Sequence, residues 1–230
     1  MSHRFLLTKQ SGHQPHTERG FTIIELMIAL SVLSIVLVMS AIIMIQLGRM
    51  YTKGNNEANT QNIARNVMND IASQIQLNAN TPVVIKTPPT GVVCIGTQRY
   101  TYKLDYELNG VPGSPGGTDN SPNHQVLWRD TMKSSGACQP VVGFGLTANP
   151  ADTLTKPGSG VELLSRKMRL TDFDVKTNNN SYTVMVTVAY GDDDLLQHIA
   201  GGTTRCLGSQ GGEYCAVSSL TQTVTRRLTN

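Results

Sequence analysis

The sequence lacks the residue patterns on which most enzymes depend. Only five histidines occur in 230 residues, and three of them fall within the first 20. The other two, His124 and His198, do not lie in a His-Glu-x-x-His, Gly-x-Ser-x-Gly or phosphate-binding-loop pattern. We therefore expect neither an enzyme nor a bound cofactor, and the sequence indicates a structural or binding protein.

A strong net charge is also missing. The chain carries 19 basic and 16 acidic side chains, a balance that is not the electrostatic footprint of a nucleic-acid-binding protein. Two basic clusters, Arg166–Arg169 and Arg226–Arg227, offer contacts to DNA phosphates, and the alternating Tyr100, Tyr102 and Tyr106 offer stacking surfaces. The same residues also suit exposed strand edges and a buried strand. DNA is therefore an alternative partner and not the main expectation.

Charge is absent altogether from Leu26 to Leu47, a run of about 22 residues. As a helix this run would be roughly 33 Å long, enough to cross the hydrocarbon core of a bilayer. One glutamate, Glu25, stands at its beginning, although a carboxylate costs roughly 2.5–3.5 kcal/mol at the centre of a membrane helix. The run predicts a membrane-spanning helix, and Glu25 at its beginning needs a partner for its charge.

The residues in front of this run form a specific motif, Arg19-Gly20-Phe21-Thr22-Ile23-Ile24-Glu25-Leu26. The motif resembles the class III prepilin signature of type IV pilins and of type II secretion pseudopilins. The resemblance implies that prepilin peptidase cuts between Gly20 and Phe21 and methylates the new N-terminus at Phe21. It also implies that Glu25 pairs with the N-terminal amine of a neighbouring subunit during assembly.

An ordinary signal anchor that carries an enzyme or adhesin domain is the alternative interpretation of this segment. A secretory signal has small residues after its apolar core, whereas Leu47-Gly48-Arg49-Met50 follows the core here. This mismatch favours the prepilin interpretation.

The prepilin interpretation divides the chain into four expected parts. These are a cytoplasmic leader that is removed (1–20), the membrane and assembly half of a helix (21–48), its amphipathic half (49–80) and a β-rich head (81–230). Basic residues before the span favour a cytoplasmic N-terminus. We expect single-pass insertion in the inner membrane, followed by incorporation into an extracellular pilus through helix contacts with other pilin subunits. The length and the C-terminal cysteine pair look similar to PilW- or PilV-like minor pilins.

The amphipathic half predicts a helix that packs on the head. Ile63, Val67, Ile71 and Ile75 recur every four residues and form one apolar stripe. Polar residues, Asp70 among them, are expected on the other faces. The helix is predicted to end near Asn78–Asn80, because Pro82 disfavours helix in the residue before it.

Beyond Pro82 the pattern changes to short strands. They are predicted at 83–85, 92–95, 100–108, 125–129, 168–175, 182–190 and 220–228, with loops at 110–123 and 134–160. One long helix followed only by strands predicts an α+β fold, with the helix on one face of an antiparallel sheet.

All four cysteines lie beyond the apolar run, and an even number there suits two disulfides in an oxidising compartment. Three pairings are possible. The short glycine-rich segment between Cys206 and Cys215 favours that pair, which leaves Cys94 with Cys138.

Three consecutive carboxylates, Asp192, Asp193 and Asp194, are the one candidate metal site in the sequence. Such a group can supply oxygen ligands to Ca²⁺, but it lacks the spacing and the distal glutamate of an EF-hand loop. A solvated turn is the interpretation that we prefer.

Overall fold

The structure, a computed structural model, describes residues 20–108, 125–132, 138–139, 160–178, 181–199, 203–208 and 211–227. The expected leader up to residue 19, the expected loop at 110–123 and most of 134–160 lie outside these residues. The chain divides into two units, one that ends at Leu47 and one that runs from Gly48 to Asn230.

One long helix, α1 (Ile23–Leu77), contains 55 residues and forms part of both units. Asn78 closes its C-terminal end. The Asn78 backbone N–H donates to the carbonyl of Gln74 (3.1 Å), and its side-chain amide donates to the same carbonyl (2.8 Å). This end is the one that the sequence predicts ahead of Pro82.

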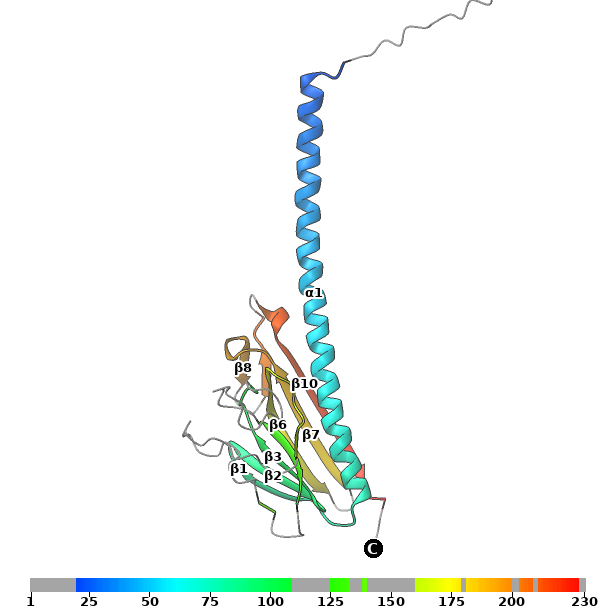
Figure 1. The fold of residues 1–230 in the computed structure, drawn as a ribbon, viewed down its shortest axis with the longest axis vertical. Helices are drawn as coiled ribbons and strands as arrows, with labels where there is room; N and C mark the ends of the chain where they lie inside the picture. Colours follow the sequence, from blue (N-terminus) through cyan, green and yellow to red (C-terminus); the bar gives the residue numbers. More distant parts are fainter. Residues whose placement is uncertain are drawn as a thin grey trace, which may run out of the picture. The chain divides into compact units, whose positions relative to one another are not determined.

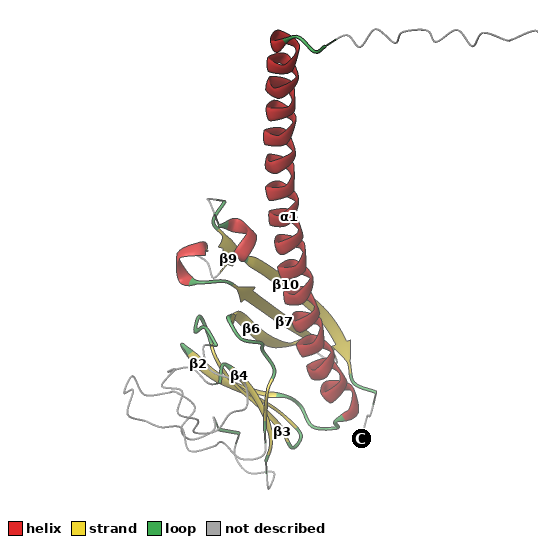
Figure 2. Ribbon diagram, turned by 45° about the horizontal axis from the view of Figure 1, so that its top comes forward, coloured by secondary structure: helices red, strands yellow, loops and turns green. Residues whose placement is uncertain are grey.

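The strands of the second unit pair in an antiparallel manner in three sheets (Figures 1 and 2). The five-stranded sheet has the order β1 (Val83–Thr87), β2 (Thr90–Ile95), β3 (Gln98–Lys103), β4 (Leu127–Thr131) and β5 (Val161–Glu162). The three-stranded sheet has the order β10 (Ala216–Thr225), β7 (Ser181–Tyr190) and β6 (Met168–Asn178). The small sheet pairs β8 (Leu196–Ile199) with β9 (Thr203–Cys206), and two short 3-10 helices complete the described elements, η1 (Asp193–Leu195) and η2 (Gly212–Tyr214). The predicted α+β fold is confirmed, with several sheets where one was expected.

The C-terminal part of α1 packs against the strands, and Figure 1 shows it beside β10 and β7. Of the predicted stripe, Val67, Ile71 and Ile75 are at most 1% exposed, as is the flanking Ala64, and Ile63 is partly buried against the same core. They share one core with Tyr100 of the five-stranded sheet and with alternate residues of β7, namely Tyr182, Val184, Val186 and Val188. The predicted stripe is therefore confirmed as the seam between helix and head.

A β-bulge in β6 lets both ends of that strand face the core. Pairing with β7 shifts between Leu170 and Asp172, which leaves Thr171 as the extra residue. Met168 and Leu170 are buried before the shift, and Phe173 and Val175 after it. The apolar positions change from even to odd numbers at the bulge, so apolar and polar residues do not alternate without interruption along β6.

Most predicted strand boundaries differ from the observed ones, two of them by four residues or more, and β5, β8 and β9 were not predicted. The strand expected at 100–108 ends at Lys103, because Asp105 adopts a left-handed conformation (φ 63°) and its N–H donates to the carbonyl of Leu170. The strand expected at 220–228 spans Ala216–Thr225 instead. Its partner β7 begins at Ser181, which pairs with Thr225, so β7 offers no residue for a longer β10.

Candidate processing and assembly site

Gly20 and Phe21 form an open junction in front of α1. Both residues are exposed, and Phe21 keeps 79% of its surface accessible. A Cβ atom added to Gly20 would meet nothing within 4 Å in the described part of the chain. The fold itself therefore does not require glycine here, and any such requirement arises from a molecule that acts on the junction.

Thr22 and Glu25 cap the first turn of α1. The Glu25 N–H donates to Thr22 Oγ1 (3.3 Å), and Thr22 Oγ1 donates to Glu25 Oε2 (3.4 Å). Threonine followed three residues later by glutamate is the capping-box sequence, which provides acceptors for N–H groups that lack a partner in the helix. The carboxylate also lies at the positive end of the helix dipole. The Thr-x-x-Glu spacing is a sequence signal for this local role, which the prepilin resemblance does not indicate.

The helix surface from Phe21 to Leu47 has no cover in the described structure, where every residue of this range is exposed. The Ser31, Ser34 and Ser40 hydroxyls donate to backbone carbonyls within the helix at 2.7–2.8 Å, so the surface stays apolar. Among the described residues, α1 is the one helix that is long and apolar enough to span a membrane. A bare apolar surface of this size needs lipid or other apolar helices around it.

The comparison with known families falls on this same segment. The model described as the prokaryotic N-terminal methylation motif matches residues 15–41, a range that contains Gly20, Phe21 and Glu25. This match supports a type IV pilin-like protein. Proteins with this motif are structural and not enzymatic. No curated protein and no solved structure matches the chain, and the likeness to PilW- or PilV-like minor pilins stays a prediction.

Polar contacts fasten the head of this pilin-like chain to the second part of α1. Asp70 accepts a hydrogen bond from the Tyr100 hydroxyl (2.9 Å) through Oδ2, and its Oδ1 forms an ion pair with Arg129. Burial, together with the Asp70 carboxylate, raises the pKa of Tyr100 far above its usual value. Asp70 lies beside the apolar stripe, as expected, but it contacts the head. Residues distant in sequence give it a hydroxyl and a cation, which no local pattern reveals.

The structure contains two disulfides, Cys94–Cys138 and Cys206–Cys215, with Cα–Cα distances of 5.9 and 5.7 Å. These are the pairs that the sequence favours. The second bond closes residues 206–215, which we name the disulfide loop. This loop contacts α1, because Asn56 Nδ2 donates to the Glu213 carbonyl (2.9 Å) and Arg49 Nε lies 3.7 Å from Glu213 Oε1.

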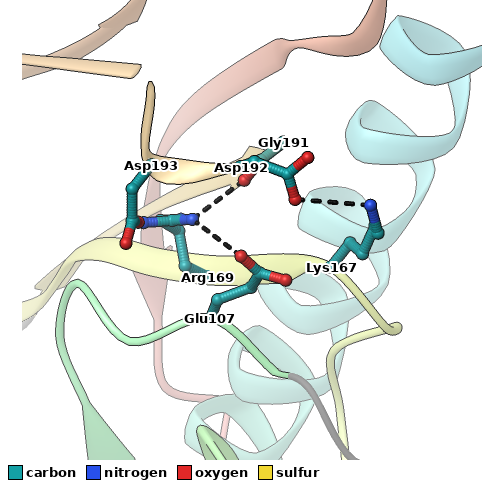
Figure 3. Close-up of polar contacts among 6 residues, drawn as sticks. All are labelled: Glu107, Lys167, Arg169, Gly191, Asp192 and Asp193. Atoms are coloured by element: carbon teal, nitrogen blue, oxygen red, sulfur yellow. Dashed lines mark hydrogen bonds and ion pairs between the residues drawn. The ribbon is translucent and has the colours of Figure 1, made fainter. Parts of the chain in front are cut away.

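Two of the three aspartates after Gly191, Asp192 and Asp193, form salt bridges with cations (Figure 3). Asp193 forms an ion pair with the buried Arg169, and Asp192 lies 3.3 Å from Lys167 Nζ. Arg169 also donates to the Gly191 carbonyl (2.8 Å) and to Glu107 (3.2 Å). Within the described residues, no group of three or more potential ligands could hold a metal ion. All three aspartates are exposed, which agrees with a solvated turn.

Some of the residues that could have offered a DNA surface are occupied inside the head, whereas Arg166, Lys167 and Arg227 are exposed. Arg169 is 1% exposed, and Tyr100 and Tyr102 are buried in the core and cannot stack on bases. Arg226 donates to the Ala79 carbonyl, and its guanidinium lies 5.5 Å from the ring centre of Tyr182. Because Arg226 and Arg227 follow the end of β10, the idea that they protect a strand edge is also wrong.

A buried carboxylate that sequence reasoning missed, Glu162, joins β4 to β5. Its oxygens accept the backbone N–H groups of Val126 (2.8 Å), Leu127 (3.0 Å) and Leu164 (3.0 Å). Burial raises the pKa of Glu162 to about 7, and the backbone hydrogen bonds offset this only in part. A lone glutamate in a loop-rich stretch gives no sequence signal for such a position.

Proposed function

We propose that the protein is a minor pilin or pilin-like structural subunit of a type IV pilus. Prepilin peptidase cuts the chain between Gly20 and Phe21 and methylates Phe21. The protein then resides in the inner membrane as a single-pass subunit with a cytoplasmic N-terminus. The bare helix afterwards leaves the lipid and packs among the helices of other subunits in the filament, where the head initiates, caps or decorates it.

One observation supports this proposal: an open Gly-Phe junction is followed by an exposed helix surface on which Glu25 is the one charged residue up to Leu47, and the same chain continues into a folded head. Lipid and neighbouring pilin helices are both apolar, so the same surface suits the membrane before assembly and the filament after it. Within its own helix, the Glu25 carboxylate contacts only the Thr22 cap of the first turn. A positive amine at the N-terminus of a neighbouring subunit would neutralise that charge and set the axial register between subunits.

The test is mass spectrometry of the N-terminus of the native protein. We expect a chain that begins with N-methylated Phe21. An intact N-terminus at Met1 in the membrane fraction would overturn the proposal and favour a signal anchor. Deletion of the gene then separates the two assembly systems, since loss of surface pili supports the proposal, whereas loss of protein secretion with normal pili indicates a type II secretion pseudopilin.

A further inference from the structure

A groove with several charges lies between α1 and the disulfide loop, within the second unit. It has a volume of about 550 Å³ and is lined by α1 residues between 49 and 57 and by residues between 204 and 217. Its cations are Arg49, Lys53 and Arg205, and its carboxylates are Glu57 and Glu213. We name it the juxtamembrane groove, because it begins two residues beyond Leu47, the last residue of the apolar run.

The positive charges of this groove are only loosely neutralised within the protein. Arg49 Nε lies 3.7 Å from Glu213 and Lys53 Nζ lies 3.9 Å from Glu57, while both cations keep more than half of their side-chain surface exposed. Arg205 donates to the neutral amide of Gln197 (3.1 Å). Exposed and long ion pairs of this kind exchange partners easily, so an anion from outside can compete for all three cations.

The position of Arg49 in the sequence places the near edge of this groove at the level of lipid headgroups. Arg49 follows Leu47 by two residues, so the covalent chain keeps it within about 7 Å of the end of the apolar run, and the polar region on each side of a bilayer is about 5–8 Å thick. Contacts of Glu213 with Arg49 and Asn56 hold the disulfide loop at the same level of the helix. This step rests on the proposed function, which puts the apolar run in the membrane.

The exposed side chains around the groove suit a membrane interface. Met50, Tyr51 and Tyr214 are 71%, 79% and 56% exposed, and tyrosine is enriched where headgroups meet water. Lys and Arg are normally scarce next to the outer end of a span. Arg49 and Lys53, which follow this span directly, therefore need a partner that compensates their charge.

We propose that the juxtamembrane groove binds the headgroups of anionic phospholipids in the leaflet on the side of the head. The phosphates contact Arg49, Lys53 and Arg205, and Tyr51 and Tyr214 lie among the headgroups. Lipid binding thereby keeps the disulfide loop against the membrane until the subunit is extracted into a filament, where the three cations are free for other partners.

The test uses the full-length protein in nanodiscs of phosphatidylcholine, alone or in an equal mixture with phosphatidylglycerol. Hydrogen exchange is measured over residues 48–58 and 204–217. We expect exchange to slow about fivefold or more with phosphatidylglycerol, because each Lys or Arg near an anionic surface contributes about a factor of five. High salt should remove the difference, since screening shortens the range of the attraction to a few ångströms.

Matched variants assign the effect to the groove. The triple variant Arg49→Gln, Lys53→Gln and Arg205→Gln should lose the effect of phosphatidylglycerol. Arg65→Gln removes an exposed cation elsewhere on the same helix and should keep it. Glu213→Gln breaks the ion pair with Arg49 but retains every cation, and should keep or strengthen it.

Each contrary outcome has its own meaning. Equal exchange in both lipids, with the protein inserted in both, overturns the lipid site and leaves the proposed function intact. Equal protection after inorganic phosphate is added to phosphatidylcholine discs indicates a site for free anions and also overturns it. Protection that depends on the number of protein copies per disc indicates a second copy as the occupant. A chain that inserts into neither lipid contradicts the proposed function itself.

Discussion

The two parts of α1 show how differently one helix can be stabilised. From Ile23 to Leu47 every residue is exposed and none but Glu25 is charged, whereas from Thr60 to Ile75 one stripe is buried and the other faces carry polar groups. The second part owes its position to the core of the head. The first part has no such contact with the described residues of its own chain, so its apolar surface is open to molecules outside the chain, which in our proposal are lipid and other subunits.

The carboxylates of these two parts repeat the contrast. Asp70 meets Tyr100 and Arg129 within the protein. Glu25 has only its local cap with Thr22, and none of the described cations forms an ion pair with it. A carboxylate that is satisfied within the chain therefore serves folding, and the one next to the apolar span is the residue that we propose for assembly.

The largest expected effect comes from Gly20→Val, which should abolish processing. A side chain at position 20 meets no described atom of the protein, so the thermal unfolding of the head should not change. Mass spectrometry of the N-terminus reports the processing, and circular dichroism reports the unfolding. Normal cleavage of this variant would show that the junction does not need its glycine.

Variants of Glu25 and Thr22 separate charge from capping. Glu25→Gln keeps a residue that can complete a capping box but loses the charge, whereas Thr22→Val loses the cap, worth about 1 kcal/mol, and keeps the charge. We expect Glu25→Gln and Glu25→Val to insert and to be cleaved but to assemble poorly, with Thr22→Val close to normal. The amount of subunit in sheared filaments measures assembly. If Glu25→Gln assembled normally and Thr22→Val did not, capping would be the main role of Glu25.

Ile71→Ala and Leu33→Ala test the contrast between the two parts of the helix. Ile71 is 0% exposed and Leu33 is 53% exposed. Loss of a buried Ile side chain to Ala typically costs about 2–5 kcal/mol of unfolding free energy, and Leu33→Ala should change the unfolding of the head by less than about 0.5 kcal/mol. Denaturant titration in micelles, followed through the buried Trp128, measures both. Equal losses would mean that the bare part also stabilises the head.

The elements that the sequence predicts well are those with a local signal. The uncharged run, the four-residue stripe and the alternation of β7 depend on neighbouring residues, and so does the Gly20-Phe21-Glu25 motif. The end of β3 and the start of β10 depend on partner strands, and local alternation misplaced both. The bulge in β6 has a visible trace, since its apolar positions change from even to odd numbers, but only pairing with β7 shows the cause.

The contacts that hold the head on α1 lie beyond local prediction for the same reason. Arg129 is 59 residues from Asp70, and Glu213 is 157 residues from Asn56. Glu162 is a further example, since a charged residue in a two-residue strand reads as exposed. Its burial follows from backbone N–H groups at 126 and 127, more than 30 residues away.

The last test of the contrast between the two parts of α1 is the pH dependence of stability. It should affect only the part that packs in the core of the head. Glu162 accepts N–H groups from Leu127 and Leu164, whose side chains share the core with Ile71. The pKa of Glu162 is raised from 4.5 to about 7, so between these values the folded state binds more protons than the unfolded state. The unfolding free energy of the head should fall as the pH rises from about 4.5 to about 7, by on the order of 3 kcal/mol at most, and then level off. In Glu162→Gln this slope should become much shallower, with the remainder due to Glu107 and Asp172, whose pKa values burial also raises. Stability should be lower throughout, because an amide cannot accept all the backbone N–H groups. Glu57→Gln, which changes an exposed carboxylate, should keep the slope, and an unchanged slope in Glu162→Gln would assign the titration to another group.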